Sequence, residues 1–442
     1  MTGPTQQQLD ACAARRGRLM QAIGPGGVAI VPSAHEVVRN RDVHYRFRQD
    51  SDFRYLSGFL EPDAVLVLAP GRADGEFVIF CRDRDTTQEI WHGRRSGPDG
   101  ARADFGADQA FVIDEFEERL PDLLSGRQRV HMTLGDHEHY DSLVTACVRE
   151  IREVSRRGAA APEEFVAMET SLHEMRLIKS AGELELMRTA GRVSAEAHRR
   201  AMAVTAPGVN ECRVGAEIHY EFEKLGMEPG YGSIIAGGEN ACILHYTENN
   251  RELRDGDLLL IDAGGEYQGY SADITRTFPV NGIYSGPQRA VYEVVLAAQR
   301  AAIDTLRVGN CCDAPHRTAS RVLTEGLVDL GLLSGEIDEL VETEAFKRFF
   351  MHGTGHWLGM DVHDVGRYKI DGQHRPFEPG MVMTVEPGLY IATDADVDER
   401  FRGIGVRIED DIVVTDGDPE NLTADVPVAI DEIEALMREA RG

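Results

Sequence analysis

Two aspartates and two glutamates occur within or beside apolar, strand-like runs in the second half of the chain. Asp262 ends the run DLLLID, Asp273 lies in YSADITRTF, Glu386 follows MVMTV, and Glu409 lies in GVRIEDDIVV. In a hairpin symmetric about Tyr267–Gln268, the two aspartates would face each other, about 4.5–5.5 Å apart at Cβ. Such carboxylates repel each other unless a cation lies between them. An isolated pair could equally be a turn cap and a solvated acid, but the apolar surroundings favour a metal site.

Three histidines occur close together in the glycine-rich segment MHGTGHWLGMDVHDVG. His352 and His356 have the i, i+4 spacing of zinc-protease helices, but the glutamate of HExxH is missing, and Gly353 and Gly355 disfavour a helix. The segment also lacks GxGxxG and a Walker lysine. A lone histidine is usually structural, whereas three within twelve residues, including His363, favour a functional loop.

Four carboxylates and one imidazole form a chemically coherent ligand set. Their charge of −4 would be balanced by two divalent cations, and oxygen-rich ligands without thiolates favour harder cations such as Mn²⁺. Two cations about 3.5–4 Å apart can bridge a water, lower its pKa and polarise a scissile carbonyl group. Amide hydrolysis is the natural chemistry. By the period of two, Arg407 shares a strand face with Glu409, and either glutamate alone could belong to a structural ion pair.

The elements that must position these residues follow from apolar spacing. Residues 1 to about 155 predict an α/β unit, with a helix near 6–22 followed by strands in VAIVPSA, AVLVLAP, EFVIFCRD and RVHMTLGD. The small and charged residues of Arg156–Glu164 predict a linker. Helical spacing then recurs from Glu183, at 287–306 and at 315–330, between strand-like runs. This alternation favours an α+β domain with helices on one face of an antiparallel sheet.

Composition excludes several classes of protein. The chain has 47 basic and 75 acidic residues, a net charge of −28, and no basic run, so nucleic-acid binding is not expected. No apolar run approaches the roughly 20 residues of a membrane helix, and the N-terminus lacks a secretory signal. Seven cysteines without a CxxC motif favour neither a disulfide framework nor a zinc ribbon, and predict a cytoplasmic protein.

Several of these segments together resemble bacterial aminopeptidase P, a proline-specific metallopeptidase of the pita-bread group. The resemblance is carried by LLLIDAGGEYQGYSADITRTFPV, ILHYTEN, FFMHGTGHWLGMDVHDVG, EPGMVMTVEPGLYI and RGIGVRIEDDIVV, and extends to RQDSDFRYLSGFLEPDAVLVL, EIWHGRRSG and HEMRLIKS. It implies an N-terminal creatinase-like α/β domain at 1–160, for substrate access and oligomerisation. It also implies a catalytic pita-bread domain at 176–442, with helices packed on a curved antiparallel sheet.

The resemblance implies two divalent metal ions, with Mn²⁺ the preferred candidate. Asp262 would bind one ion, Asp273 and Glu409 would bridge both, and His356 and Glu386 would complete the other. Glu386 would also shuttle protons around a metal-bridging hydroxide.

The resemblance also implies the substrate site. His245 and His363 would line it, with His363 stabilising the tetrahedral intermediate or binding the peptide carbonyl. Further substrate contacts are expected from His352, Tyr390 and Arg407, and from Trp91, which in a homodimer or homotetramer would reach a neighbouring active site. The main departure from the family pattern is Thr354, at a position where related chains vary. Thr354 is not expected to contact the reacting groups.

The implied reaction is hydrolysis of the N-terminal Xaa-Pro bond of peptides with proline in second position. That bond is a tertiary amide whose proline offers no N–H, so an aminopeptidase that grips this N–H fails on it. The alternatives are a prolidase that cuts Xaa-Pro dipeptides with the same ligands, a non-catalytic pita-bread peptide-binding module, and a metal-free creatinase-like hydrolase. The complete set of five ligands disfavours the last two.

Overall fold

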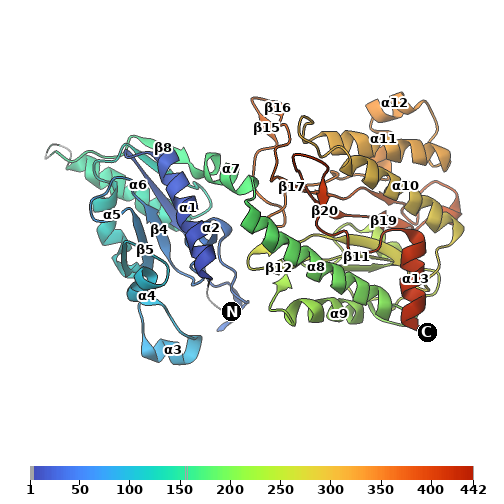
Figure 1. Cartoon of the computed structure of the whole chain (residues 1–442), viewed down its shortest axis with the longest axis horizontal. Helices are drawn as coiled ribbons and strands as arrows, with labels where there is room; N and C mark the ends of the chain where they lie inside the picture. The colour runs from blue at the N-terminus through green and yellow to red at the C-terminus, as the bar shows by residue number, and fades with distance from the viewer. Residues whose placement is uncertain (1–3, 155, 157, 442) are drawn as a thin grey trace. The chain divides into compact units, whose positions relative to one another are not determined.

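The computed structural model describes residues 4–154, 156 and 158–441 and divides into two compact units at Glu174/Met175 (Figure 1). The N-terminal unit contains a mixed sheet in the order β6-β5-β4-β1-β7-β8. Its strands are β1 (Gly27–Pro32), β4 (Val65–Leu68), β5 (Phe77–Cys81), β6 (Gln109–Val112), β7 (Arg129–Met132) and β8 (Glu164–Ala167). Its main helices are α1 (Gln6–Ile23), α2 (Ser51–Ser57), α3 (Thr86–His92), α4 (Gly97–Ala103), α5 (Phe116–Leu124) and α6 (Glu138–Glu153).

The sheet of the N-terminal unit confirms the expected α/β class. Strand β1 runs antiparallel to β4 and parallel to β7, and its apolar residues are buried with those of α5 and α6. A strand buried along its whole length needs the continuous apolar run seen in VAIVP, because both faces are covered.

Residues 158–163 of the segment expected to be a linker form neither helix nor strand, and its last residue, Glu164, begins β8. Strand β8 pairs in parallel with β7, and the Glu163 amide donates to the Gln128 carbonyl over 2.9 Å. The N-terminal unit therefore continues to Glu174, beyond the expected end at 160, while the expected start at 176 lies next to the observed division. The physical reason is that β8, which follows the linker, pairs with β7 and so keeps the chain in the N-terminal sheet beyond residue 160. Arg157, within the predicted linker, lies outside the described residues.

Long helices dominate the C-terminal unit, where the apolar spacing predicted them. They are α8 (Ala181–Val204), α9 (Glu211–Glu223), α10 (Gly286–Ile303) and α11 (Ala314–Asp329), with the shorter α12 (Ile337–Glu342) and α13 (Ile430–Arg441). A capping box between Ser180 and Glu183 begins α8, because the two side chains bond each other's backbone N–H groups. Helices α8 and α9 pack together, as do α10 and α11, and Figure 1 shows the two pairs on opposite sides of the strands.

The strands between these helix pairs are antiparallel. They form the sheets β10-β11-β14, β13-β12-β9, β17-β20-β21 and β18-β19. Their bounds are β9 (Glu228–Pro229), β10 (Ile234–Gly237), β11 (Leu258–Asp262), β12 (Gly265–Tyr267), β13 (Tyr270–Ser271), β14 (Thr275–Pro279), β17 (Val382–Val385), β18 (Gly388–Tyr390), β19 (Gly405–Arg407), β20 (Asp410–Val413) and β21 (Glu420–Asn421). Helices packed on antiparallel strands confirm the expected α+β class. Among the described residues, no helix is both long and apolar enough to span a membrane.

Candidate metal centre

The hairpin that carries the two aspartates has a different register from the one predicted. Asp262 pairs with Thr275, and Tyr267 pairs with Tyr270. The turn is therefore centred on Gln268–Gly269, whose φ angles of 50° and 89° are both in the left-handed region. Two-residue turns of this type match the twist of the strands, and glycine adopts the second position without strain. The prediction that Asp262 and Asp273 face each other across the ladder was therefore wrong.

A half-buried tyrosine nevertheless brings the two aspartates together. The Tyr231 hydroxyl lies 2.7 Å from Asp262 Oδ1 and also contacts Asp273 Oδ1. Both aspartates are buried residues. The sequence reasoning missed Tyr231, because a single tyrosine between Gly230 and Gly232 carries no chemical signal.

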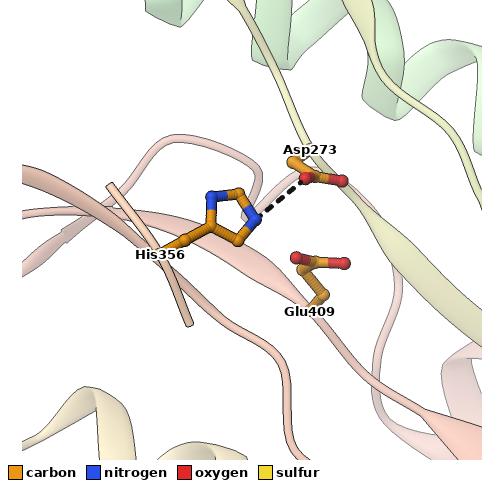
Figure 2. A group of neighbouring side chains, drawn as sticks. All are labelled: Asp273, His356 and Glu409. Atoms are coloured by element: carbon orange, nitrogen blue, oxygen red, sulfur yellow. Dashed lines mark ion pairs between the residues drawn. The ribbon is translucent and has the colours of Figure 1, made fainter. Parts of the chain in front are cut away.

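The imidazole of His356 reaches the second aspartate and a glutamate. One ligand atom from each of Asp273, His356 and Glu409 lies within 4.8 Å of the others, a spacing that could hold a metal ion (Figure 2). His356 Nδ1 is 3.0 Å from the Trp357 carbonyl oxygen, which leaves Nε2, 3.5 Å from Asp273 Oδ2, to face the carboxylates. Figure 2 shows that the three side chains converge from three separate segments.

Glycine makes the backbone approach at His356 possible. A Cβ atom on Gly355 would lie 1.9 Å from the Thr384 carbonyl oxygen, so any other residue would push the segment away from β17. The segment is irregular, as expected for a loop that is not a zinc-protease helix.

The two glutamates come from different segments of the C-terminal unit. Glu386 follows β17, and its amide donates to the Thr354 carbonyl over 2.8 Å, while its carboxylate lies 3.8 Å from His356 Nε2. The Thr354 side chain is directed elsewhere, to His316 Nδ1 at 2.9 Å.

Glu409 lies between β19 and β20, so its predicted mid-strand position was wrong. It forms an isolated bridge with Thr275 of β14, whose hydroxyl donates to Glu409 Oε2 over 2.6 Å. The bridge interrupts the strand because the backbone of Glu409 pairs with β14 at a single residue.

These carboxylates are electrostatically unfavourable without a counter-charge. Burial, followed by the neighbouring acids, raises the pKa of Asp273 and holds the pKa of Glu409 well above its ordinary value. Burial also raises the pKa of Glu386 to about 7. Although burial disfavours the charged imidazole, the hydrogen bond and charge of Asp273 raise the pKa of His356 to about 9. The donor set therefore fits bound cations, which supply the missing positive charge.

A chain of hydrogen bonds extends from Asp262 through Arg407 and Tyr390 to His352. Arg407 Nη2 donates to Asp262 Oδ2 over 2.6 Å, and Nη1 donates to the Tyr390 hydroxyl over 3.1 Å. The Tyr390 hydroxyl lies 2.8 Å from His352 Nε2, and His352 Nδ1 lies 2.7 Å from the Gly353 carbonyl. Because a carbonyl only accepts, this network assigns the proton of His352 to Nδ1 and lets Nε2 accept from Tyr390. Burial, and then Arg407, lowers the pKa of His352 to about 4, so the ring is neutral.

The remaining predicted residues are more exposed. The ring centroid of His363 lies 4.3 Å from that of His356, at an interplanar angle of 83°. Burial, followed by the neighbouring His356 and His245, lowers the pKa of His363. The side chain of His245 is exposed. Trp91 belongs to α3 of the N-terminal unit, and its side chain is 78% exposed.

Two families of known domains match the chain. Residues 185–416 match metallopeptidase family M24, and residues 12–132 match the aminopeptidase P N-terminal domain. The Xaa-Pro aminopeptidase of Escherichia coli is 48% identical over 97% of both chains. Aminopeptidase PepP from Pseudomonas aeruginosa superposes with a TM-score of 0.96 at 53% identity, over 98% of each chain. Zinc-substituted Escherichia coli aminopeptidase P in complex with product superposes with a TM-score of 0.95 at 47% identity, over 98% of this chain and 99% of that one.

Proposed function

This chain belongs to metallopeptidase family M24 and is an Xaa-Pro aminopeptidase, and we propose that its buried carboxylate site carries out the hydrolysis. The substrate is a peptide with proline in second position, and the product is its free N-terminal residue. The observation that carries the proposal is the convergence of Asp273, His356 and Glu409 within ligand distance. These residues lie in a chain that matches Xaa-Pro aminopeptidases over nearly its whole length.

Five side chains would hold two divalent cations, with Mn²⁺ the preferred candidate. They are Asp262, Asp273, His356, Glu386 and Glu409. The absence of a thiolate from the set favours a harder cation. When bound, the cations would lower the pKa of a water molecule and polarise the carbonyl group of the scissile bond. The raised pKa values of the buried acids support this role, because cations would remove the repulsion that causes part of the shift.

Glu386 is the proposed proton carrier. Its carboxylate lies 3.8 Å from His356 Nε2, beside the other proposed ligands, where it would accept a proton from the attacking water and return it. The acceptor of that proton is the proline nitrogen, which becomes a secondary amine as the bond breaks. His352 Nδ1, 3.7 Å from Glu386 Oε2, lies beside this path.

The histidines and the Arg407 chain would bind the substrate. A neutral His363 has one N–H to donate to the scissile carbonyl oxygen, and its lowered pKa keeps it neutral at pH 7. Holding the carbonyl suits an Xaa-Pro bond, since proline has no N–H to grip. Arg407 orients both Asp262 and Tyr390, and so connects the substrate side of the site to the ligands. His245 would line the substrate site together with His363.

The N-terminal unit is proposed to serve substrate access and assembly. An indole as exposed as that of Trp91 supports a contact with a second copy, in a homodimer or homotetramer. A cytoplasmic location is supported by seven free cysteines, since thiols persist in reducing compartments.

A panel of peptides with and without metal tests the function. Mn²⁺-loaded protein should cleave Xaa-Pro-Yaa tripeptides faster than Xaa-Pro dipeptides, and should leave Xaa-Ala-Yaa peptides intact. A strong chelator should remove the activity, and Glu386→Ala should abolish turnover while exposed Glu342→Ala does not. Preference for the dipeptide would indicate a prolidase, and chelator-resistant turnover would refute the cation site.

A further inference from the structure

A buried carboxylate outside the metal centre, that of Glu211, accepts hydrogen bonds from the residues around His245. Glu211 is the first residue of α9, and its side chain is 0% exposed. Its two oxygens lie within hydrogen-bond distance of four donors. Oε1 accepts from the Gly237 amide at 2.7 Å and from Asn240 Nδ2 at 3.2 Å. Oε2 accepts from the Tyr246 hydroxyl and from the Arg251 amide, both at 2.8 Å.

Three of these donors flank the segment that carries His245, and the fourth, Tyr246, lies within it. The segment 243–249 follows the short helix at Gly238–Cys242 and precedes Arg251, which lies next to the isolated bridge between Asn210 and Glu252. Within it, His245 is exposed, whereas the adjacent Tyr246 is only 5% exposed. The hydrogen bond from Tyr246 to Glu211 therefore holds the backbone directly beside the histidine.

The far end of the segment is tied to the strand next to the metal ligands. Asn249 has a left-handed φ of 47°, and its side chain bonds the Ile235 amide at 2.9 Å and the Ser233 carbonyl at 2.8 Å. Ile235 belongs to β10, which pairs with β11, the strand that ends at Asp262. The loop 243–249 is thus hydrogen-bonded to Glu211 through Tyr246 and to β10 through Asn249. Strand β10 in turn pairs with β11, which ends at Asp262.

The geometry points to Glu211 as a positioning residue that sets the location of His245 relative to the metal-binding carboxylates. This inference rests on the proposed function, in which His245 binds substrate. All four partners of Glu211 are N–H or O–H donors, so the position requires a group that only accepts. A glutamine would present an amide N–H₂ to two of these donors, and the loop would lose its fixed geometry. A displacement of about 1 Å at a substrate-binding group can cost about 100-fold in rate.

A double-mutant cycle separates positioning from general stability. We expect Glu211→Gln to lower kcat/KM for an Xaa-Pro-Yaa peptide about 10- to 100-fold. The double variant Glu211→Gln/His245→Ala should be no worse than His245→Ala alone, because both changes remove the same interaction. Additive losses would overturn the inference, as would an unchanged kcat/KM in His245→Ala. Tyr246→Phe removes only one of the four donors and should give a smaller loss of the same kind.

Two measurements are independent of turnover. Amide hydrogen exchange in residues 243–249 should accelerate in Glu211→Gln but not in β11, and Mn²⁺ affinity by calorimetry should be unchanged. Glu223→Gln, exposed at the other end of α9, is the matched control and should change neither. Unaltered loop exchange in Glu211→Gln would overturn the inference. A wild-type protein that fails to cleave Xaa-Pro peptides would instead refute the proposed function, because the exchange measurement does not depend on activity.

Discussion

Replacing Lys179 with methionine should destabilise the C-terminal unit, because it breaks a buried ion cluster. Lys179 Nζ lies 2.9 Å from Asp364 Oδ2, and Arg176 Nη2 lies 2.6 Å from Asp364 Oδ1. None of the three side chains is more than 3% exposed. Removing one partner of a buried ion pair costs about 3–5 kcal/mol. Since Arg176 keeps its bond to Asp364, we expect the lower end, about 3 kcal/mol, or a fall of about 6–12 °C in the thermal midpoint.

The effect should depend on pH with a definite sign. Burial raises the pKa of Asp364, but Lys179 and Arg176 outweigh it and hold that pKa below its ordinary value. A carboxyl group with a lowered folded-state pKa contributes stability above its unfolded pKa of about 3.9, and loses it as the pH falls through the folded-state value. Without Lys179 this pKa rises. The difference in the free energy of unfolding between variant and wild type should therefore be largest at pH 7 and should decrease below about pH 4.

Calorimetric unfolding scans with and without Mn²⁺ measure this effect. The cation stabilises only the unit that holds its site, so the transition that moves with Mn²⁺ identifies the C-terminal unit. Lys347→Met is the matched control, because Lys347 pairs with Glu344 on the surface, where ion pairs contribute about 0–1 kcal/mol. Equal effects of the two substitutions at pH 7 would refute the reasoning.

Three further substitutions test the site. Glu409→Gln should abolish turnover yet raise the thermal midpoint of the metal-free protein, because burial and neighbouring acids hold the pKa of Glu409 well above its ordinary value; a lower midpoint would contradict this. Tyr231→Phe should weaken Mn²⁺ binding about 10-fold by calorimetry, while exposed Tyr220→Phe leaves it unchanged. Gly264→Ala should prevent folding, because its Cβ would lie 1.7 Å from the Ala272 carbonyl oxygen, and a soluble, active variant would disprove that close approach.

Local patterns predicted the elements well. The helices α8, α10 and α11 lie where apolar residues recur every three or four positions, because one face of each must be buried. Elements defined by pairing partners were predicted less well. Strand β8 was not predicted, since composition does not report which strand edge is available.

In the metal centre, too, the candidate residues were predicted from local patterns, whereas their contacts were not. The residue types and their apolar surroundings were sufficient to single out Asp262, Asp273 and Glu409 as metal-site candidates. Their relative placement was not, because the turn at Gln268–Gly269 moved the hairpin register by two residues. Tyr231 could not be found from the sequence, since its role depends on contacts with two aspartates that lie 31 and 42 positions later in the chain.

The sequence by itself determined which chemistry is available: an acid-rich ligand set without thiolates, on an apolar α+β framework. Only the tertiary structure decided which oxygens share a proton donor, which histidine faces the acids, and which buried groups support them. Residue type and periodicity are local properties, whereas hydrogen-bond partners and burial depend on contacts between segments far apart in the chain. Glu211 illustrates the difference, since its carboxylate contacts residues 26 to 40 positions away.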